Sequence, residues 1–178
     1  DAAPPFDWLA EVFDSKQVSP EDRERLFGLI TAADSPFHVG IGMRSHEEID
    51  RINILRATHE SMRDAIVNLV FSPDYVLVDG TEIPRLGLPQ EKVIKGDSLC
   101  LSIAAASIVA KVTRDRIMIR LAADYPQYGF DTHKGYGTPD HIEAIRRHGR
   151  SPVHRRSFKV ATLDEPELWT EHRQGRRA

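Results

Sequence analysis

Two aspartates, each following a strand-like run, are the first residues whose type and spacing could support chemistry. Asp79 follows the apolar run Tyr75-Val76-Leu77-Val78, and Asp97 follows the shorter run Val93-Ile94. Acids that leave neighbouring strands can converge at one sheet edge, where the carboxylates repel each other unless a cation lies between them. Oxygen ligands suit Mg²⁺ or Mn²⁺, so the pair is a candidate site for either ion. Alternatively, Asp79-Gly80 only forms the turn that leaves the strand.

A third acid, Asp115, closes the basic segment Lys111-Val112-Thr113-Arg114-Asp115. On a helix, Lys111 and Asp115 are four positions apart and can form an ion pair on one face. This ordinary interpretation is favoured over a metal-binding role. Asp115 and Lys111 are therefore expected to be structural, or to support the site through their neighbours.

The glycine-flanked segment His133-Lys134-Gly135-Tyr136-Gly137-Thr138 predicts a loop that presents an aromatic ring and a cation. Tyr136 could stack against a sugar or base, and Lys134 could meet a phosphate. Tyr136 could equally be a loop anchor packed on the core. The eight histidines show no helical pair with a matching acid, so a zinc site is not expected.

The charge is unevenly distributed along the chain, although the net charge is only −3. Residues 1–50 carry 4 basic and 11 acidic side chains, whereas residues 111–160 carry 11 basic and 5 acidic ones. A basic region of this kind is a plausible contact surface for phosphates. The alternative is a solvated basic face without a partner.

The composition, with 40% hydrophobic and 29% charged residues over 178 positions, predicts one ordinary globular domain. No apolar run is long enough to cross a membrane, and no secretory signal is evident at the start of the printed chain. The single cysteine, Cys100, excludes an internal disulfide and a cysteine-based zinc site. A cytoplasmic monomer is the expected form.

Local signals predict the elements that must position these residues. Ser19-Pro20-Glu21-Asp22 predicts a helix to about Ala33, and residues 36–43 alternate as expected of a strand. Ser45 and Glu48 form a capping box before a helix that should run to about Val70.

Later in the chain, short strands are expected at residues 75–78 and 93–94, and an alanine-rich helix at residues 102–121. A last helix is expected between Thr138 and Gly149. The order of elements predicts an α/β or α+β domain, with a central mixed sheet flanked by helices. Residues 1–160 are expected to form the domain, and residues 161–178 a polar tail.

In their order along the chain, these motifs resemble the ribonuclease HII family. The alanine-rich helix that ends in Lys-Val-Thr-Arg-Asp, followed by His-Lys-Gly-Tyr-Gly-Thr, is the most specific part. The resemblance covers roughly residues 12–160, and its other matching stretches are Asp14-Ser15-Lys16, residues 53–58, Val78-Asp79-Gly80, Lys95-Gly96-Asp97 and residues 151–158.

The resemblance implies a ribonuclease H-like fold with a C-terminal helical region. It also implies hydrolysis on the 5′ side of a ribonucleotide, which leaves a 3′-hydroxyl and a 5′-phosphate. The implied substrates are RNA–DNA hybrids and duplex DNA with single embedded ribonucleotides, as in ribonucleotide excision during DNA replication and repair. Asp79 and Asp97 match catalytic carboxylates that bind Mn²⁺ or Mg²⁺. Tyr136 matches the tyrosine that stacks on the sugar beside the RNA–DNA junction, and Lys16 is expected near the backbone phosphates.

The family normally opens with a strand that carries an Asp-Glu pair and a Gly-Arg-Gly turn, which supply half of its carboxylates and read the 2′-hydroxyl. The printed chain contains no such segment, and Asp164-Glu165 lies in the polar tail, where it cannot substitute. We therefore expect the first strand to be missing from a truncated or incompletely recorded chain. Such a chain should cleave weakly or not at all.

Two other functions remain possible from the sequence. One is a catalytically dead module that binds RNA–DNA duplexes through the basic region and Tyr136, with steep salt dependence and no turnover. The other is a small-molecule enzyme that uses Asp79 as a general acid or base. That enzyme would respond neither to Mg²⁺ or Mn²⁺ nor to nucleic acid.

Overall fold

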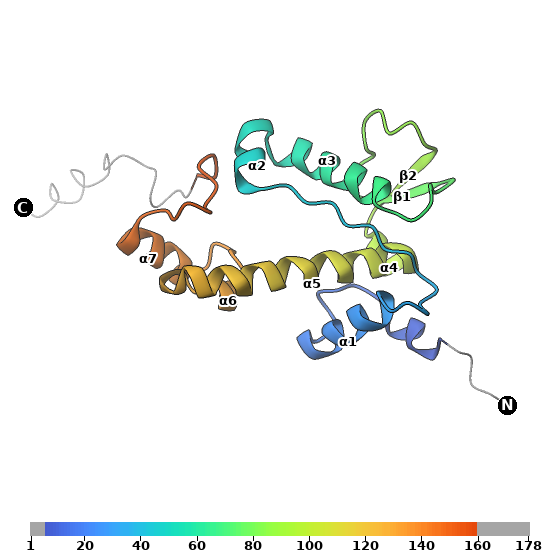
Figure 1. Ribbon diagram of the computed structural model, residues 1–178, viewed down its shortest axis with the longest axis horizontal. Helices are drawn as coiled ribbons and strands as arrows, with labels where there is room; N and C mark the ends of the chain where they lie inside the picture. Colours follow the sequence, from blue (N-terminus) through green and yellow to red (C-terminus); the bar gives the residue numbers. More distant parts are fainter. Residues whose placement is uncertain (1–5, 160–178) are drawn as a thin grey trace, which may run out of the picture.

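The structure, a computed structural model, describes residues 6–159 of the chain. Figure 1 shows a mostly helical arrangement around one long central helix, with a small sheet near one end of it. In chain order the elements are η1 (Asp7–Glu11), α1 (Pro20–Ile30), α2 (His46–Ile52), α3 (Ile54–Val67), β1 (Val76–Asp79), β2 (Gln90–Val93), α4 (Gly96–Leu99), α5 (Leu101–Asp124), η2 (Pro126–Tyr128), α6 (Phe130–His133) and α7 (Pro139–His148).

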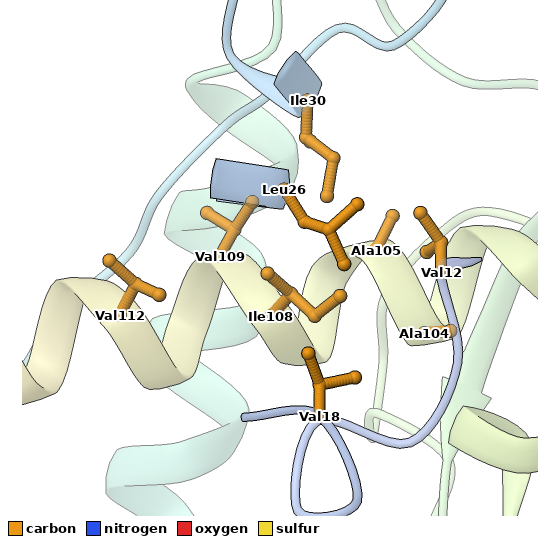
Figure 2. Close-up of a cluster of buried hydrophobic side chains, with 9 residues drawn as sticks. All are labelled: Val12, Val18, Leu26, Ile30, Ala104, Ala105, Ile108, Val109 and Val112. Atoms are coloured by element: carbon orange, nitrogen blue, oxygen red, sulfur yellow. The ribbon is translucent and has the colours of Figure 1, made fainter. Parts of the chain in front are cut away.

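The central helix, α5, organises the main hydrophobic core. Its small residues Ala104 and Ala105 let α1 approach closely, and Leu26 of α1 packs there with no exposed surface. Burying a leucine of this kind stabilises the fold by about 1.5–3 kcal/mol. Figure 2 shows the cluster, which consists of Val12, Val18, Leu26, Ile30, Ala104, Ala105, Ile108, Val109 and Val112.

The predicted helix ends are confirmed where the sequence carries capping residues. The Ser19 side chain accepts a hydrogen bond from the Asp22 N–H, and Ser45 forms a capping box with Glu48. Thr138 caps α7, which ends at Gly149 with a φ of 74°. Each such cap satisfies backbone donors that the first helical turn leaves free, a contribution of about 1 kcal/mol.

The predicted single helix from Ser45 to Val70 is wrong in one respect, because it is broken into α2 and α3 at Asn53. Asn53 has a φ of 68°, which interrupts the helical backbone. Its side chain then accepts a hydrogen bond from the Arg56 N–H and so begins α3.

The predicted strand at residues 36–43 is also wrong: the segment is extended but pairs with no strand among the described residues. It runs between α5 and the α2–α3 pair instead (Figure 1). Gly40 and Gly42 touch the α3 backbone so closely that a Cβ at either position would overlap the carbonyl of Ala65 or Ser61. The Asn68 side chain also donates to the Ile41 carbonyl. Residues 36–43 are therefore held by contacts with α3 and not by hydrogen bonds to another described strand.

The sheet within residues 6–159 has two parallel strands, β1 and β2, rather than the larger mixed sheet expected. A ten-residue connection, 80–89, joins them without a helix. The Gln90 side chain holds this connection through two 2.8 Å hydrogen bonds to the main chain of Ile83, which is buried. The predicted tail, 161–178, lies outside the described residues. No helix in the described part of the chain is both long and apolar enough to span a membrane.

Candidate active site

The structure brings Asp79 and Asp97 to the same edge of the sheet. The two strands are parallel, and Asp79 is paired in register with Val93, so both strands end side by side. The Oδ1 atom of Asp79 accepts a hydrogen bond of 3.0 Å from the Gly96 N–H, the residue directly before Asp97. The Asp79 carboxylate is therefore bound to the backbone of the residue next to Asp97.

The turn between β2 and α5 explains how Asp97 reaches this edge. Lys95 has a left-handed backbone, with a φ of 57° and a ψ of 41°, which turns the chain out of β2 into α4. Gly96 is buried against α5, where a Cβ would lie 2.5 Å from Cδ1 of Ile103. Only glycine fits this approach without displacing a neighbour, so close packing on α5 fixes the position of Asp97.

The two carboxylates fit the donor chemistry of a hard divalent cation. Asp79 is exposed and Asp97 is half-buried, and no ion pair within residues 6–159 joins either to a basic side chain. Uncompensated neighbouring carboxylates with oxygen donors suit Mg²⁺ or Mn²⁺. The described residues nevertheless contain no group of three or more candidate metal ligands. The donor type therefore fits, although the pair alone makes a sparse site.

Asp115 has the ion-pair environment that its spacing from Lys111 predicts. Lys111 Nζ lies 2.8 Å from Oδ1 of Asp115, and Arg23 of α1 lies 3.9 Å from Oδ2. Arg23 also donates hydrogen bonds of 2.8 Å to the carbonyls of Ser15 and Val18. Asp115 thus pairs α5 with Arg23 of α1, and Arg23 in turn holds the loop before α1. These contacts give Asp115 a structural role.

Tyr136 is exposed and lies against the basic face of α5. Tyr136 lies in the loop after α6 and is 58% exposed, so it is not an anchor buried in the core. The guanidinium carbon of Arg114 lies 4.9 Å from the ring centroid, and Lys111 Nζ lies 5.6 Å from it. Lys111 is roughly 15 Å along α5 from the end that Asp97 precedes, at 1.5 Å per residue. The Tyr136 ring therefore lies beside α5 several turns away from the end of the helix that follows Asp97.

The two lysines predicted to bind substrate differ in their surroundings. Lys16 is exposed, in a loop held to α5 by a 2.8 Å hydrogen bond between the Ser15 and Ser107 hydroxyls. Lys134 is half-buried, and its ammonium donates to the Asp131 carbonyl. Lys16 is thus free to approach a phosphate, whereas Lys134 would first have to leave its present contact.

Sequence reasoning missed two features of this region. Arg114 lies closest to the Tyr136 ring, and its spacing of three from Lys111 could have placed both on one helical face. His133, His141 and His154 gather beneath the Tyr136 loop, although they come from three separate segments. No local pattern in the sequence could have brought those three together.

Comparison with known proteins places these features in one family. The family model described as Ribonuclease HII matches residues 8–161. The chain is 50% identical over 151 residues to ribonuclease HII of Geobacter metallireducens, which corresponds to 85% of this chain and 70% of that protein. It is 52% identical over 151 residues to the Geobacillus kaustophilus protein and 50% identical over 147 residues to the Clostridioides difficile protein, spanning 57% of the length of each.

A solved structure gives the same result for the fold. The ribonuclease H2 of Pyrococcus horikoshii superposes with a TM-score of 0.70 and 26% identity, over 87% of this chain and 81% of that one. The α/β ribonuclease H-like fold expected from the sequence is therefore confirmed. Because the family model matches residues 8–161, which is most of the chain, the chain belongs to the ribonuclease HII family.

Proposed function

We propose that this chain carries part of the active centre of a metal-dependent endonuclease that cuts the RNA strand of RNA–DNA hybrids, including single ribonucleotides embedded in duplex DNA. The observation that carries the proposal is the meeting of Asp79 and Asp97 at one sheet edge, joined through the Gly96 N–H. Membership of the ribonuclease HII family supports the reaction class. We place its action in the cytoplasm, as a monomer.

Asp79 and Asp97 would hold the divalent ion, and Mn²⁺ and Mg²⁺ both fit their oxygen donors. When bound, such an ion would stabilise the negative charge that develops on the phosphate and would make a water molecule a better nucleophile. The Gly96 N–H holds one oxygen of the Asp79 carboxylate, Oδ1, through a 3.0 Å hydrogen bond. The products would be a 5′-phosphate and a 3′-hydroxyl.

The exposed residues along α5 would hold the duplex. Tyr136 offers a ring to the sugar beside the cut, and the neighbouring Arg114 and Lys111 add positive charge near the phosphates. Lys16 projects from the loop held at Ser107 on the same helix. Recognition of RNA against DNA requires contact with the 2′-hydroxyl, the group that separates them locally.

The proposed centre is incomplete within the 178 residues, because they contain no Asp-Glu pair followed by Gly-Arg-Gly. Two carboxylates hold a cation less tightly than a fuller set of ligands. The 178-residue polypeptide should therefore cleave weakly or not at all by itself, while retaining affinity for the duplex through α5.

The test uses a labelled DNA duplex with one embedded ribonucleotide, in Mn²⁺ and in Mg²⁺. The 178-residue chain is assayed alone and preceded by a family strand that carries the Asp-Glu pair and the Gly-Arg-Gly turn. We expect the fusion to cut on the 5′ side of the ribonucleotide. Asp79→Asn should lower its rate roughly 100-fold or more, since even residues that support metal ligands are worth 10- to 100-fold.

Asp74→Asn is the matched control, because Asp74 is also exposed and lies just before β1, away from Asp97. This variant should cut like the parent fusion. Equal rates in the Asp79→Asn and parent fusions would contradict the proposal. A fusion that binds duplex with steep salt dependence but never cuts would favour the alternative of a catalytically dead binding module.

A further inference from the structure

Three histidines from separate segments form a cluster beneath the loop that carries Tyr136. His133 ends α6, His141 lies in the first turn of α7, and His154 follows α7. The His133 and His141 rings stack with centroids 4.1 Å apart, and the His141 and His154 centroids are 5.2 Å apart. Phe130 packs against all three rings. It belongs to a second hydrophobic cluster with Tyr128 and Ile145, so the imidazoles lie against that cluster.

The hydrogen-bond partners of His141 and His154 determine which ring nitrogen of each histidine donates and which accepts. His141 Nδ1 lies 2.9 Å from the Tyr136 carbonyl, which only accepts, so Nδ1 carries the proton. Its Nε2 is then an acceptor and lies 3.0 Å from His154 Nε2, which must donate. At the other end, the Ser151 N–H donates to His154 Nδ1 at 3.0 Å, which again requires the proton on Nε2.

The two ends thus assign the same tautomers independently. The Ser151 hydroxyl lies 2.6 Å from His154 Nδ1 and adds a second hydrogen bond between Ser151 and this nitrogen. The series of donors runs from Ser151 through His154 and His141 to the Tyr136 carbonyl, and we name these three side chains the imidazole relay. Both of its rings must be neutral.

His133 holds the preceding residue of the same loop. Its Nδ1 accepts from the Gly135 N–H at 3.1 Å, and its Nε2 donates to the Tyr128 carbonyl at 2.6 Å. The loop backbone is therefore held on both sides of the Gly135–Tyr136 peptide by two stacked imidazoles. The Tyr136 ring, in contrast, faces solvent beside Arg114.

We propose that the imidazole relay positions Tyr136 for contact with the substrate sugar, so that Ser151, His154 and His141 are positioning residues for recognition of the ribonucleotide. The inference rests on the proposed function, since it assumes that Tyr136 contacts the duplex. It assigns a purpose to a buried polar network that lies outside the carboxylate site.

Protonation would break the relay. A second proton on His141 would lie on Nε2 and would face the His154 Nε2–H across their 3.0 Å link. A second proton on His154 would lie on Nδ1 and would face the Ser151 N–H, which is 3.0 Å away. The charged or titratable groups around the relay would also oppose a positive ring: Arg150 and His133 near His154, His133 beside His141, His148 beyond Tyr128, and Lys111 and Arg114 around the Tyr136 ring.

The pKa values agree with this geometry. Burial, followed by the charges of His141 and Arg150, lowers the pKa of His154 to about 4. Burial also lowers the pKa of His141, with His133 contributing in the same direction. The relay is thus intact at neutral pH and lost on strong acidification.

The first arm of the test is nitrogen-15 NMR of the imidazoles in the full 178-residue chain. We expect His141 to carry its proton on Nδ1 and His154 on Nε2 at neutral pH, and both to stay neutral at pH values where free histidine is charged. A proton on Nε2 of His141, or a charged His154 at about its ordinary pKa of 6.5, would overturn the relay. This arm needs neither a variant nor nuclease activity.

The second arm uses the fusion with the family strand and compares its affinity for a duplex with one ribonucleotide and for an all-DNA duplex. Tyr136→Ala should reduce the preference for the ribonucleotide roughly fivefold or more, the lower range for loss of one aromatic stack. His154→Leu should reduce it similarly while leaving affinity for the all-DNA duplex unchanged. His154→Gln, which keeps an amide donor for His141, should restore much of the preference.

The matched control is His148→Gln, because His148 contacts Tyr128 but lies outside the relay. A full preference in folded His154→Leu would overturn the positioning role. A full preference in Tyr136→Ala would instead overturn the proposed contact with substrate, and with it the purpose assigned to the relay. The NMR result separates these two failures.

Discussion

Acid should destabilise the fold through His154 in particular, and the size of the effect follows from its environment. The ring is half-buried and its pKa falls from 6.5 to about 4 on folding. Because the unfolded chain binds the proton more readily, the contribution of His154 is fully present above about pH 6.5 and is lost as the pH falls toward 4.

The full shift of about 2.5 pKa units corresponds to about 3 kcal/mol, at 1.36 kcal/mol per unit. At about pH 5, before the folded ring takes up its proton, about 2 kcal/mol of this is already lost. Domains of this size are stable by about 5–15 kcal/mol in total, so the loss is large enough to measure.

The assay is urea unfolding followed by circular dichroism at about pH 7.5 and about pH 5. The His154→Gln variant cannot titrate at this position, so its loss of stability between the two pH values should be smaller than that of the parent by about 2 kcal/mol. His38→Gln removes an exposed ring outside the relay and is the matched control. An unchanged pH dependence in His154→Gln would refute the reasoning.

Three further predictions concern packing, ion pairing and substrate contact. Gly96→Ala should cost about 1–3 kcal/mol of unfolding free energy in urea, because the new Cβ meets Ile103. Asp115→Asn should lower the melting temperature, since Lys111 loses its counter-ion, yet leave Mn²⁺ binding unchanged; a loss of Mn²⁺ binding would make Asp115 a ligand. Lys16→Gln should lower the slope of log affinity against log salt for duplex binding by about one, and an unchanged slope would remove Lys16 from the phosphate contacts.

The elements that the sequence predicted well are those specified by local chemistry. Ser19, Ser45 and Thr138 cap helices through their own side chains, and those signals need no distant partner. The alanine-rich segment likewise predicts a closely packed helix wherever it lies in the fold. Asp79 could be placed at a strand end for the same reason, since the apolar run and the following glycine are neighbours in sequence.

The remainder depended on contacts between distant segments. Residues 36–43 alternate like a strand, but a strand also needs a partner, and in this structure the segment packs on α3. Asn53 breaks a helix through a positive φ that its residue type permits but does not require. The histidine cluster joins three segments, so it could be found only in three dimensions. The meeting of Asp79 and Asp97 required the parallel pairing of two short strands.

The central claim, that Asp79 and Asp97 together bind the divalent ion, is tested most directly by adding Mn²⁺ during amide NMR of the full chain. The paramagnetic ion broadens nearby signals even when it binds weakly. We predict that the amides of Gly80, Gly96 and Asp97 broaden first, that Asp79→Asn abolishes this selectivity, and that Asp74→Asn preserves it. Selective broadening elsewhere, or equal broadening in the Asp79→Asn variant, would contradict the claim.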